Sequence, residues 1–341
     1  MGANEKQLEV INNIDGIYIV DAGAGTGKTY TITQRYLNIL DKGISPDDIL
    51  LVTFTRNAAI HMKEKVMSKA GPEKATDILE APILNFDSFC FKIISKFGLN
   101  APKILGIEDN LSGFKLITES VIQKRVFNKF FNQFLEKYQD KYKEVLVKIS
   151  NQSEIQSLIE QLLSKGVYPT KTGWFLDSNI KLKGNLEEYL KRFNELNKEG
   201  IGARGAVQSE LLKKFNQKKN YLDLPEDFVQ GKQINPELGE LAFNDNRDDF
   251  LEFIHHVYFD YIEYMVRENL MTFSLTAMFA FLILYNDDEI RKANSFDYVM
   301  VDEFQDTNEM QFMLILLLMR KTNLWVIGEW KQGSYGFRNA T

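Results

Sequence analysis

Two short stretches of this 341-residue chain hold residues whose types and spacing suit chemistry on phosphates. The first reads VDAGAGTGKTY and covers residues 20–30, where Lys28 and Thr29 follow a run of small residues. Backbone N–H groups of such a loop can cradle phosphate oxygens at the start of a helix. Lys28 would then reach the terminal phosphates, and Thr29 would bind Mg²⁺. We therefore predict a site for ATP and Mg²⁺ in this loop.

The loop departs from the usual pattern, G-x-x-x-x-G-K-[ST], at its first position. Ala22 stands there in place of glycine, and alanine suits the position if its φ angle is negative. A flexible loop with a chance lysine is the alternative, but strand, turn and helix signals follow one another in the required order. The predicted nucleotide-binding residues are Ala22, Gly23, Ala24, Gly25, Thr26, Gly27, Lys28 and Thr29.

The second stretch, YVMVDEFQD at 298–306, places two acids directly after four apolar residues. ATP hydrolysis needs an acid that holds the metal and a group that activates the attacking water. Such a pair on its own is usually a solvated strand end. Combined with the upstream loop it predicts an ATP hydrolase, in which Asp302 binds Mg²⁺, Glu303 is the general base and Lys28 completes the catalytic set.

Strand and helix signals alternate around both stretches. Apolar runs predict buried strands over 16–21, 49–54 and 81–86, and helical spacing predicts a helix after each of them. The alternation stops near residue 103 and returns with predicted strands at 296–304 and 323–330. Continuously apolar strands that alternate with helices are typical of a parallel sheet covered on both faces. We therefore predict an α/β fold.

Helical and loop patterns with mixed lysine and glutamate fill the middle of the chain. They predict a sheet domain made of residues 1–103 plus 271–341, interrupted by a mostly helical insertion at 104–270. Within the insertion, residues 216–240 read as a loop-rich excursion.

Composition excludes several classes of protein. The net charge of −6 argues against a surface coated with positive charge, although a local basic groove stays possible. The single cysteine, Cys90, rules out an internal disulfide, and the three histidines lack metal-ligand spacing. We find no signal peptide, and the apolar run MQFMLILLLM is too short to cross a bilayer. We expect a cytoplasmic protein without a membrane partner.

A series of motifs, taken in order, resembles the superfamily 1A DNA helicases of the UvrD/Rep/PcrA type. The resemblance implies a RecA-like P-loop NTPase domain, called motor domain 1A, with the insertion in the position of subdomain 1B. It also implies ATP-dependent 3′–5′ translocation on DNA, or unwinding, in repair or replication. The matching segments are NEKQ, AGAGTGKT, VTFTRNAAIHMKEKV, NFDSFCFKII, MTFSLTAM, VDEFQDTN and VIGEWKQGSYGFRNA.

The resemblance also implies individual roles. Gln7 would read the adenine base, and Gln332 would sense the γ-phosphate as part of the catalytic set. Phe54 and Phe337 follow predicted strand ends, where an exposed aromatic ring could stack on a base. The implied partners are single-stranded DNA and single/double-strand junctions. The residues implied to contact DNA are Thr53, Phe54, Thr55, Arg56, Ser88, Tyr335, Phe337 and Arg338.

Several positions depart from the family pattern, and they fall on DNA contacts more than on the ATP site. The departing residues are Arg56 and Asn57 in place of Asn-Lys, Asp87 in place of histidine, Ser274 in place of an acid, Glu329 in place of aspartate, and Gly333 within the last motif.

The last matching motif ends just before residue 341, and the family's second motor domain follows at that point. We expect this chain to be the N-terminal part of a longer helicase, monomeric and poorly active alone. One alternative is an ATP- and DNA-binding subunit of a nuclease–helicase or defence complex without helicase activity of its own. A P-loop ATPase or kinase unrelated to DNA is a further alternative, disfavoured by the motif series.

Overall fold

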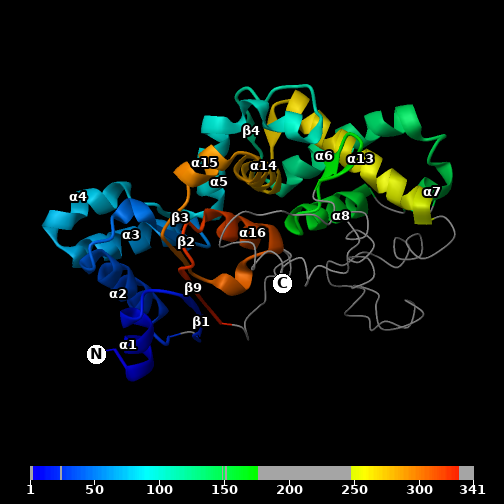
Figure 1. Cartoon of the computed structure of the whole chain (residues 1–341). Helices are drawn as coiled ribbons and strands as arrows, with labels where there is room; N and C mark the ends of the chain where they lie inside the picture. Colours follow the sequence, from blue (N-terminus) through cyan, green and yellow to red (C-terminus); the bar gives the residue numbers. More distant parts are fainter. Residues whose placement is uncertain (1–2, 24, 148, 150–151, 176–246, 330–341) are drawn as a thin grey trace. The chain divides into compact units, whose positions relative to one another are not determined.

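The structure is a computed structural model that describes residues 3–23, 25–147, 149, 152–175 and 247–329. The described residues belong to two units (Figure 1). The first unit comprises 3–93 and 283–329, and the second comprises 94–175 and 247–282. The division at 103 and 271 that the sequence suggests stays a prediction.

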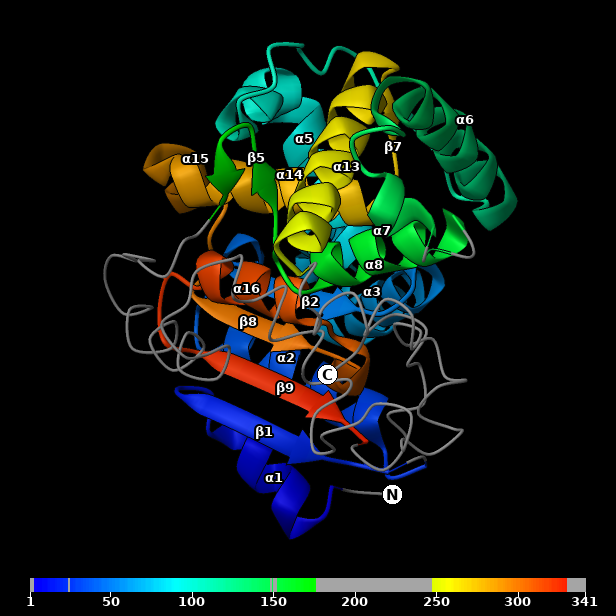
Figure 2. The same ribbon diagram turned by 90° about the vertical axis from the view of Figure 1, so that its right-hand side faces the viewer.

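Five parallel strands form the sheet of the first unit, which confirms the predicted α/β fold. Figure 2 shows β1, β9 and β8 lying side by side. Asp21 pairs with Gly328, and Val301 pairs with both Val326 and Val52, so the carboxyl ends of these strands meet at one edge. The strands, in spatial order, are β1 (Ile17–Asp21), β9 (Leu324–Gly328), β8 (Tyr298–Val301), β2 (Ile49–Thr53) and β3 (Ile83–Asn85).

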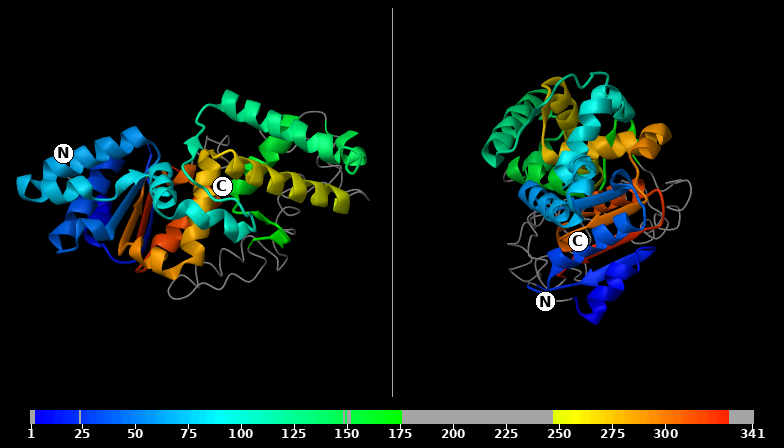
Figure 3. Two further views of the ribbon diagram at one scale, coloured as in Figure 1. Left: turned by 90° about the horizontal axis from the view of Figure 1, so that it is seen from above. Right: turned by 90° about the vertical axis from the view of Figure 1, so that its left-hand side faces the viewer.

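Helices cover both faces of this sheet. Helices α2, α3 and α4 lie on one side and α16 lies on the other (Figures 1 and 3). The helices of the unit are α1 (Glu5–Asn12), α2 (Lys28–Asp41), α3 (Arg56–Ala70), α4 (Pro72–Glu80), α5 (Phe86–Phe97, which continues into the second unit), α15 (Asp288–Ala293) and α16 (Glu309–Leu318), with short 3₁₀ helices at Pro46–Asp48 and Phe304–Asp306.

The core of the first unit lies between the sheet and helices α2 and α3. Alternate residues of β2, β8 and β9 point into it, because successive side chains of a strand face opposite sides. All residues of these three strands are buried, so both of their faces are covered, as predicted. Helix α16, formed by the run too short for a membrane, is buried except for three half-buried residues in its first turn. Among the described residues, no helix is both long and apolar enough to cross a membrane.

Strand β1 does not match its prediction, because it is not buried on both faces. Ile19 is 67% exposed and Ile17 is 39% exposed, whereas Tyr18 and Val20 pack against the core. The reason is the strand order: β1 is the terminal strand and has β9 as its neighbour on one side only. The prediction of a buried strand over 16–21 is therefore wrong for one face of β1, because an apolar run does not tell a terminal strand from an inner one.

Arg35 is a fully buried cation in α2 that holds the end of α1 against α2. Its guanidinium donates to the carbonyl oxygens of Val10, Asn13 (2.7 Å) and Ile14 (2.7 Å), at the end of α1 and just beyond it. Burial lowers the pKa of Arg35 to about 10, so the side chain is still charged at neutral pH. One side chain thus satisfies carbonyls that the helix end leaves without helical partners.

Replacing Arg35 with methionine is expected to lower the free energy of unfolding by about 3 kcal/mol, because buried carbonyls lose a charged donor. Urea unfolding followed by tryptophan fluorescence would measure the loss. The matched control is Arg56→Met, since Arg56 is exposed at the start of α3 and should leave the midpoint unchanged. Equal midpoints for the two variants would show that Arg35 does not anchor α1.

The second unit is mainly helical and has an aromatic core. Phenylalanine rings of α6 pack against one another and against the rings of Tyr261 and Tyr264 of α13. The sequence missed two small sheets here, because strands of two residues carry no alternating pattern. The elements are the 3₁₀ helix Gly98–Leu105, β4 (Lys115–Leu116) parallel to β7 (Leu270–Met271), α6 (Ser120–Tyr138), α7 (Lys143–Val147), α8 (Gln152–Ser164), β5 (Pro169–Thr170) antiparallel to β6 (Gly173–Trp174), α13 (Arg247–Arg267) and α14 (Phe273–Asn286, which continues into the first unit).

The second unit also gives a physical reason for one departure from the family pattern. Ser274 Oγ donates to a carboxylate oxygen of Glu160 at 2.6 Å. Burial raises the pKa of Glu160. A second acid at position 274 would place two carboxylates against each other in a buried setting, whereas the serine hydroxyl supplies a donor.

Candidate nucleotide-binding site

The sheet topology brings the two chemically suggestive stretches to one edge. The chain leaves β1 into residues 22–27, and it leaves β8 into Asp302 and Glu303. Strand β9 lies between β1 and β8, and all three are parallel. The carboxyl edge of a parallel sheet is where ligands bind in folds of this class.

The phosphate loop has the backbone geometry that its sequence requires. Gly25 and Gly27 have φ angles of +76° and +87°, in the left-handed region that favours glycine. Ala22 lies outside that region, so alanine is accommodated there as expected. Helix α2 begins at Lys28, and its N-cap is Gly27, which has no side chain to cap it. The N–H groups of the first turn can therefore bind an anion. Ala24 lies outside the described residues.

Lys28 and Glu303 form an ion pair across this edge. The distance from Lys28 Nζ to Glu303 Oε2 is 2.7 Å, and the side chains are 17% and 34% exposed. The cation that we expect on the phosphates is thus paired with the carboxylate that we expect to activate water. Glu303 itself has a left-handed backbone, with a φ angle of +50°. Such a conformation is costly for a non-glycine residue and recurs at functional sites.

The pKa values of Asp302 and Glu303 are shifted in opposite directions. Burial, followed by repulsion from Glu303, raises the pKa of Asp302 to about 6. Burial also acts to raise the pKa of Glu303, but hydrogen bonds from Gln305 and Lys28 outweigh it, so the pKa of Glu303 is lowered. Glu303 is therefore ionised at neutral pH, as a general base must be.

Asp302 and Thr29 fit the ligand preferences of Mg²⁺. In the described part of the chain, no cluster of three or more His, Cys, Asp or Glu side chains could hold a metal alone. Mg²⁺ is usually held by one or two carboxylates together with water and substrate phosphates, so it needs no such cluster. The raised pKa of the buried Asp302 carboxyl indicates a carboxylate that a bound cation would stabilise.

Metal-dependent nucleotide binding is expected to weaken in acid. A carboxyl with a pKa of about 6 is ionised above that pH and protonated below it, and only the ionised form binds Mg²⁺. Affinity for a nonhydrolysable Mg·ATP analogue should therefore be about tenfold weaker at pH 5 than at pH 7. Titration calorimetry at both values would measure the ratio, with Asp302→Asn as the control that lacks this dependence. A wild-type ratio equal to that of the variant would rule out Asp302 as the titrating ligand.

Gln7 lies against the phosphate loop, but its amide is engaged within the protein. Its Oε1 accepts from the backbone N–H of Asn4 at 2.9 Å, and Asn4 caps α1 in return. Its Nε2 donates to the carbonyl oxygen of Thr26 at 2.9 Å. Each of these bonds uses one of the two hydrogen bonds that the amide oxygen or nitrogen can form. Adenine recognition by Gln7 stays a prediction.

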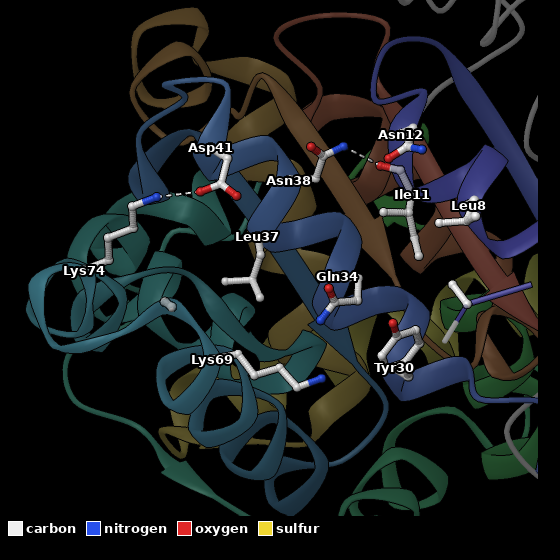
Figure 4. A pocket seen from close by; sticks show the side chains of 12 residues that line it. Leu8, Ile11, Asn12, Tyr30, Gln34, Leu37, Asn38, Asp41, Lys69 and Lys74 are labelled. Carbon is white, nitrogen blue, oxygen red and sulfur yellow. Dashed lines mark hydrogen bonds and ion pairs between the residues drawn. The ribbon is translucent and has the colours of Figure 1, made fainter. Parts of the chain in front are cut away.

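A cavity of about 590 Å³ lies along α2, from Tyr30 to Asp41 (Figure 4). It is lined by residues of α1, α2, α3 and α4. Tyr30, which directly follows Thr29, lies on its wall, and Lys69 Nζ is 4.8 Å from the centre of the Tyr30 ring. None of the predicted site residues within the described ranges lines this cavity.

Five of the residues implied to contact DNA lie at the carboxyl ends of β2 and β3 or just after them, at the same sheet edge. Arg56 and Ser88 are exposed, Phe54 is half-buried, and Thr55 caps α3 by accepting from the N–H of Ala58. Thr53 is buried, and its hydroxyl donates to the carbonyl oxygen of Thr55, so its side chain shapes the turn. The roles of these five residues in DNA binding stay predictions. The remaining predicted site residues, Gln332, Tyr335, Phe337 and Arg338, lie outside the described ranges.

Sequence reasoning missed Gln305 as a site residue. Its Nε2 donates to Glu303 Oε2 at 2.8 Å, and its Oε1 accepts from the backbone N–H of Glu329 at 3.0 Å. Its position two residues after Glu303, inside the matched stretch VDEFQDTN, was the available signal.

Comparison with known proteins places these features in one family. The family model described as UvrD/REP helicase N-terminal domain matches residues 3–341. The chain is 28% identical to the probable DNA helicase II homolog of Mycoplasma capricolum and 28% identical to the ATP-dependent DNA helicase PcrA of Staphylococcus epidermidis. It is 27% identical to the PcrA of Staphylococcus aureus. Each alignment covers 99% of this chain but only 34–35% of the relative, so the chain spans about a third of the length of these proteins.

Proposed function

We propose, from the premise that this chain belongs to the UvrD/REP helicase N-terminal domain family, that it forms the ATP-hydrolysing part of a DNA helicase. The observation that carries this proposal is the pairing of Lys28 with Glu303 beside an uncapped helix start. Relatives that align with the whole chain are named ATP-dependent DNA helicases. The reaction is the attack of water on the γ-phosphate of ATP.

The geometry supports an exchange of partners when ATP enters. The phosphates would meet the free N–H groups at the start of α2, and Lys28 would leave Glu303 for the terminal phosphates. Glu303 would then be free to take a proton from the attacking water. Asp302 and Thr29 would hold Mg²⁺. The bound ion would neutralise negative charge on the β- and γ-phosphates.

The same sheet edge supports the proposal of a DNA partner. The loops after β2 and β3 carry exposed Arg56 and Ser88, which suit contacts to a phosphate backbone. We place single-stranded DNA, and junctions between single and double strands, across these loops. Movement along the strand would run from 3′ to 5′ and serve repair or replication in the cytoplasm.

Directional displacement tests this function in the intact protein. Streptavidin bound to one end of a single strand would be released at the 5′ end, with ATP, by a motor that moves from 3′ to 5′. Release from the 3′ end would contradict the polarity. ATP-dependent release from neither end would favour the alternative of a subunit without helicase activity of its own.

A further inference from the structure

Gln305 lies at the centre of a closed ring of hydrogen bonds around the site. Lys28 bonds to Glu303, Glu303 accepts from Gln305, and Gln305 accepts from the N–H of Glu329. Gly328, the last residue of β9, closes the ring, because its carbonyl oxygen accepts from the N–H of Ala22 at 2.9 Å. The ring thus joins the phosphate loop, the predicted general base and the end of β9.

Gly328 allows Gln305 to lie this close to β9. A Cβ atom at Gly328 would collide with Gln305 Oε1 and would lie 3.1 Å and 3.2 Å from the backbone nitrogens of Gln305 and Phe304. Such backbone contacts cannot be relieved by turning a side chain. The contact between the turn after β8 and the end of β9 therefore depends on glycine at this position.

The nitrogen and the oxygen of the Gln305 amide bind different partners. The Nε2 end donates to Glu303 Oε2, the same oxygen that accepts from Lys28. If Lys28 leaves for the phosphates, Gln305 is the donor that still holds that oxygen. The Oε1 end is fixed by a backbone N–H of Glu329, which does not depend on a flexible side chain.

We infer that Gln305 is a positioning residue, which holds the carboxylate of Glu303 in place for water activation and ties that position to the end of β9. The inference rests on the proposed function, since it assigns a role within ATP hydrolysis. It predicts that Gln305 acts on turnover and not on nucleotide affinity, because Gln305 contacts Glu303 and does not contact the N–H groups at the start of α2.

The test is steady-state ATP hydrolysis by the intact protein with single-stranded DNA. Gln305→Met, which removes both ends of the amide, should lower kcat about 10- to 100-fold, as expected for loss of a hydrogen bond to a charged group. The KM for ATP should stay within about threefold of the wild-type value. Gln305→Glu keeps an acceptor for Glu329 but loses the donor to Glu303, so it should lower kcat at least as much. Because glutamate has nearly the same shape as glutamine, Gln305→Glu tests the inference even if Gln305→Met does not fold.

Gln123→Met is the matched control. Gln123 Nε2 donates to the carbonyl oxygen of Ile117 at 2.8 Å in the second unit, so its loss removes a similar bond away from Glu303. Thermal melting would show that the control and the test variants are equally folded, and the control should keep the wild-type kcat.

A double variant separates positioning from a general structural effect. In single-turnover measurements, Gln305→Met should cause no further loss when Glu303 is already replaced by glutamine, because both changes act through the same carboxylate. Equal losses in the two backgrounds, or wild-type kcat in Gln305→Met, would overturn the inference while leaving the proposed function intact. Absence of ATP hydrolysis in the wild-type protein would overturn the proposed function, and the inference with it.

Discussion

Replacing Lys28 with alanine is expected to lower DNA-stimulated ATP hydrolysis at least about 100-fold, because the developing negative charge on the phosphates loses a preorganised cation. Lys28 lies at the first position of α2, with its ammonium 2.7 Å from Glu303. Affinity for ATP should fall as well. Affinity for single-stranded DNA without nucleotide should be unchanged, because the predicted DNA contacts follow β2 and β3. Steady-state hydrolysis and fluorescence anisotropy with a labelled strand would measure the two effects.

Lys74→Ala is a matched control for this prediction. Lys74 also forms an ion pair of 2.7 Å, with Asp41, but the two side chains are 44% and 67% exposed, more than those of Lys28 and Glu303. Exposed ion pairs contribute little to stability, so this variant should hydrolyse ATP at the wild-type rate. If Lys28→Ala hydrolysed ATP as fast as Lys74→Ala, the loop would not be the phosphate site.

Replacing Glu303 with glutamine should also lower kcat at least about 100-fold, because an amide cannot take a proton from the attacking water. Here, however, affinity for ATP should be kept or increased. The change removes the negative charge that pairs with Lys28, so the lysine is free to meet the phosphates. Binding of a fluorescent ATP analogue, together with single-turnover hydrolysis, would separate the two quantities.

Glu289→Gln provides the control, since Glu289 lies in an exposed ion pair on α15 and has no place in the site. The paired variants at positions 28 and 303 distinguish binding from chemistry: the first should lose both, and the second should lose hydrolysis alone. Loss of ATP affinity in Glu303→Gln equal to that in Lys28→Ala would contradict the exchange of partners proposed for Lys28.

The sequence predicted the sheet and the order of its motifs because continuous apolar runs, such as 49–53, leave few alternatives to a buried strand. It could not predict the spatial order of the strands. The position of β1 at the end of the sheet, and the exposure of Ile19, depend on that order. Strands of two residues, such as β4, form only where tertiary packing brings a partner strand beside them. No local sequence pattern therefore predicts them.

For the site, the phosphate loop and the acid pair were predictable from residue types alone. Their mutual pairing was not, since the bond between Lys28 and Glu303 depends on β1 and β8 ending at one edge. The hydrogen bonds of Gln305 could not be predicted from the sequence for the same reason, because its second partner, Glu329, is 24 positions away. The hydrogen bond from Gln7 to Thr26 could not be predicted either, since Thr26 approaches Gln7 only when the phosphate loop is folded.

The rate of ATP hydrolysis by the intact protein, measured with and without single-stranded DNA, tests the central claim most directly. We predict slow hydrolysis without DNA and an increase of at least about tenfold with saturating single strands, because the nucleotide site and the predicted DNA contacts share one sheet edge. The same measurement on Lys28→Ala should show no increase. A wild-type rate that does not change when single-stranded DNA is added would contradict the claim that this site drives a DNA motor.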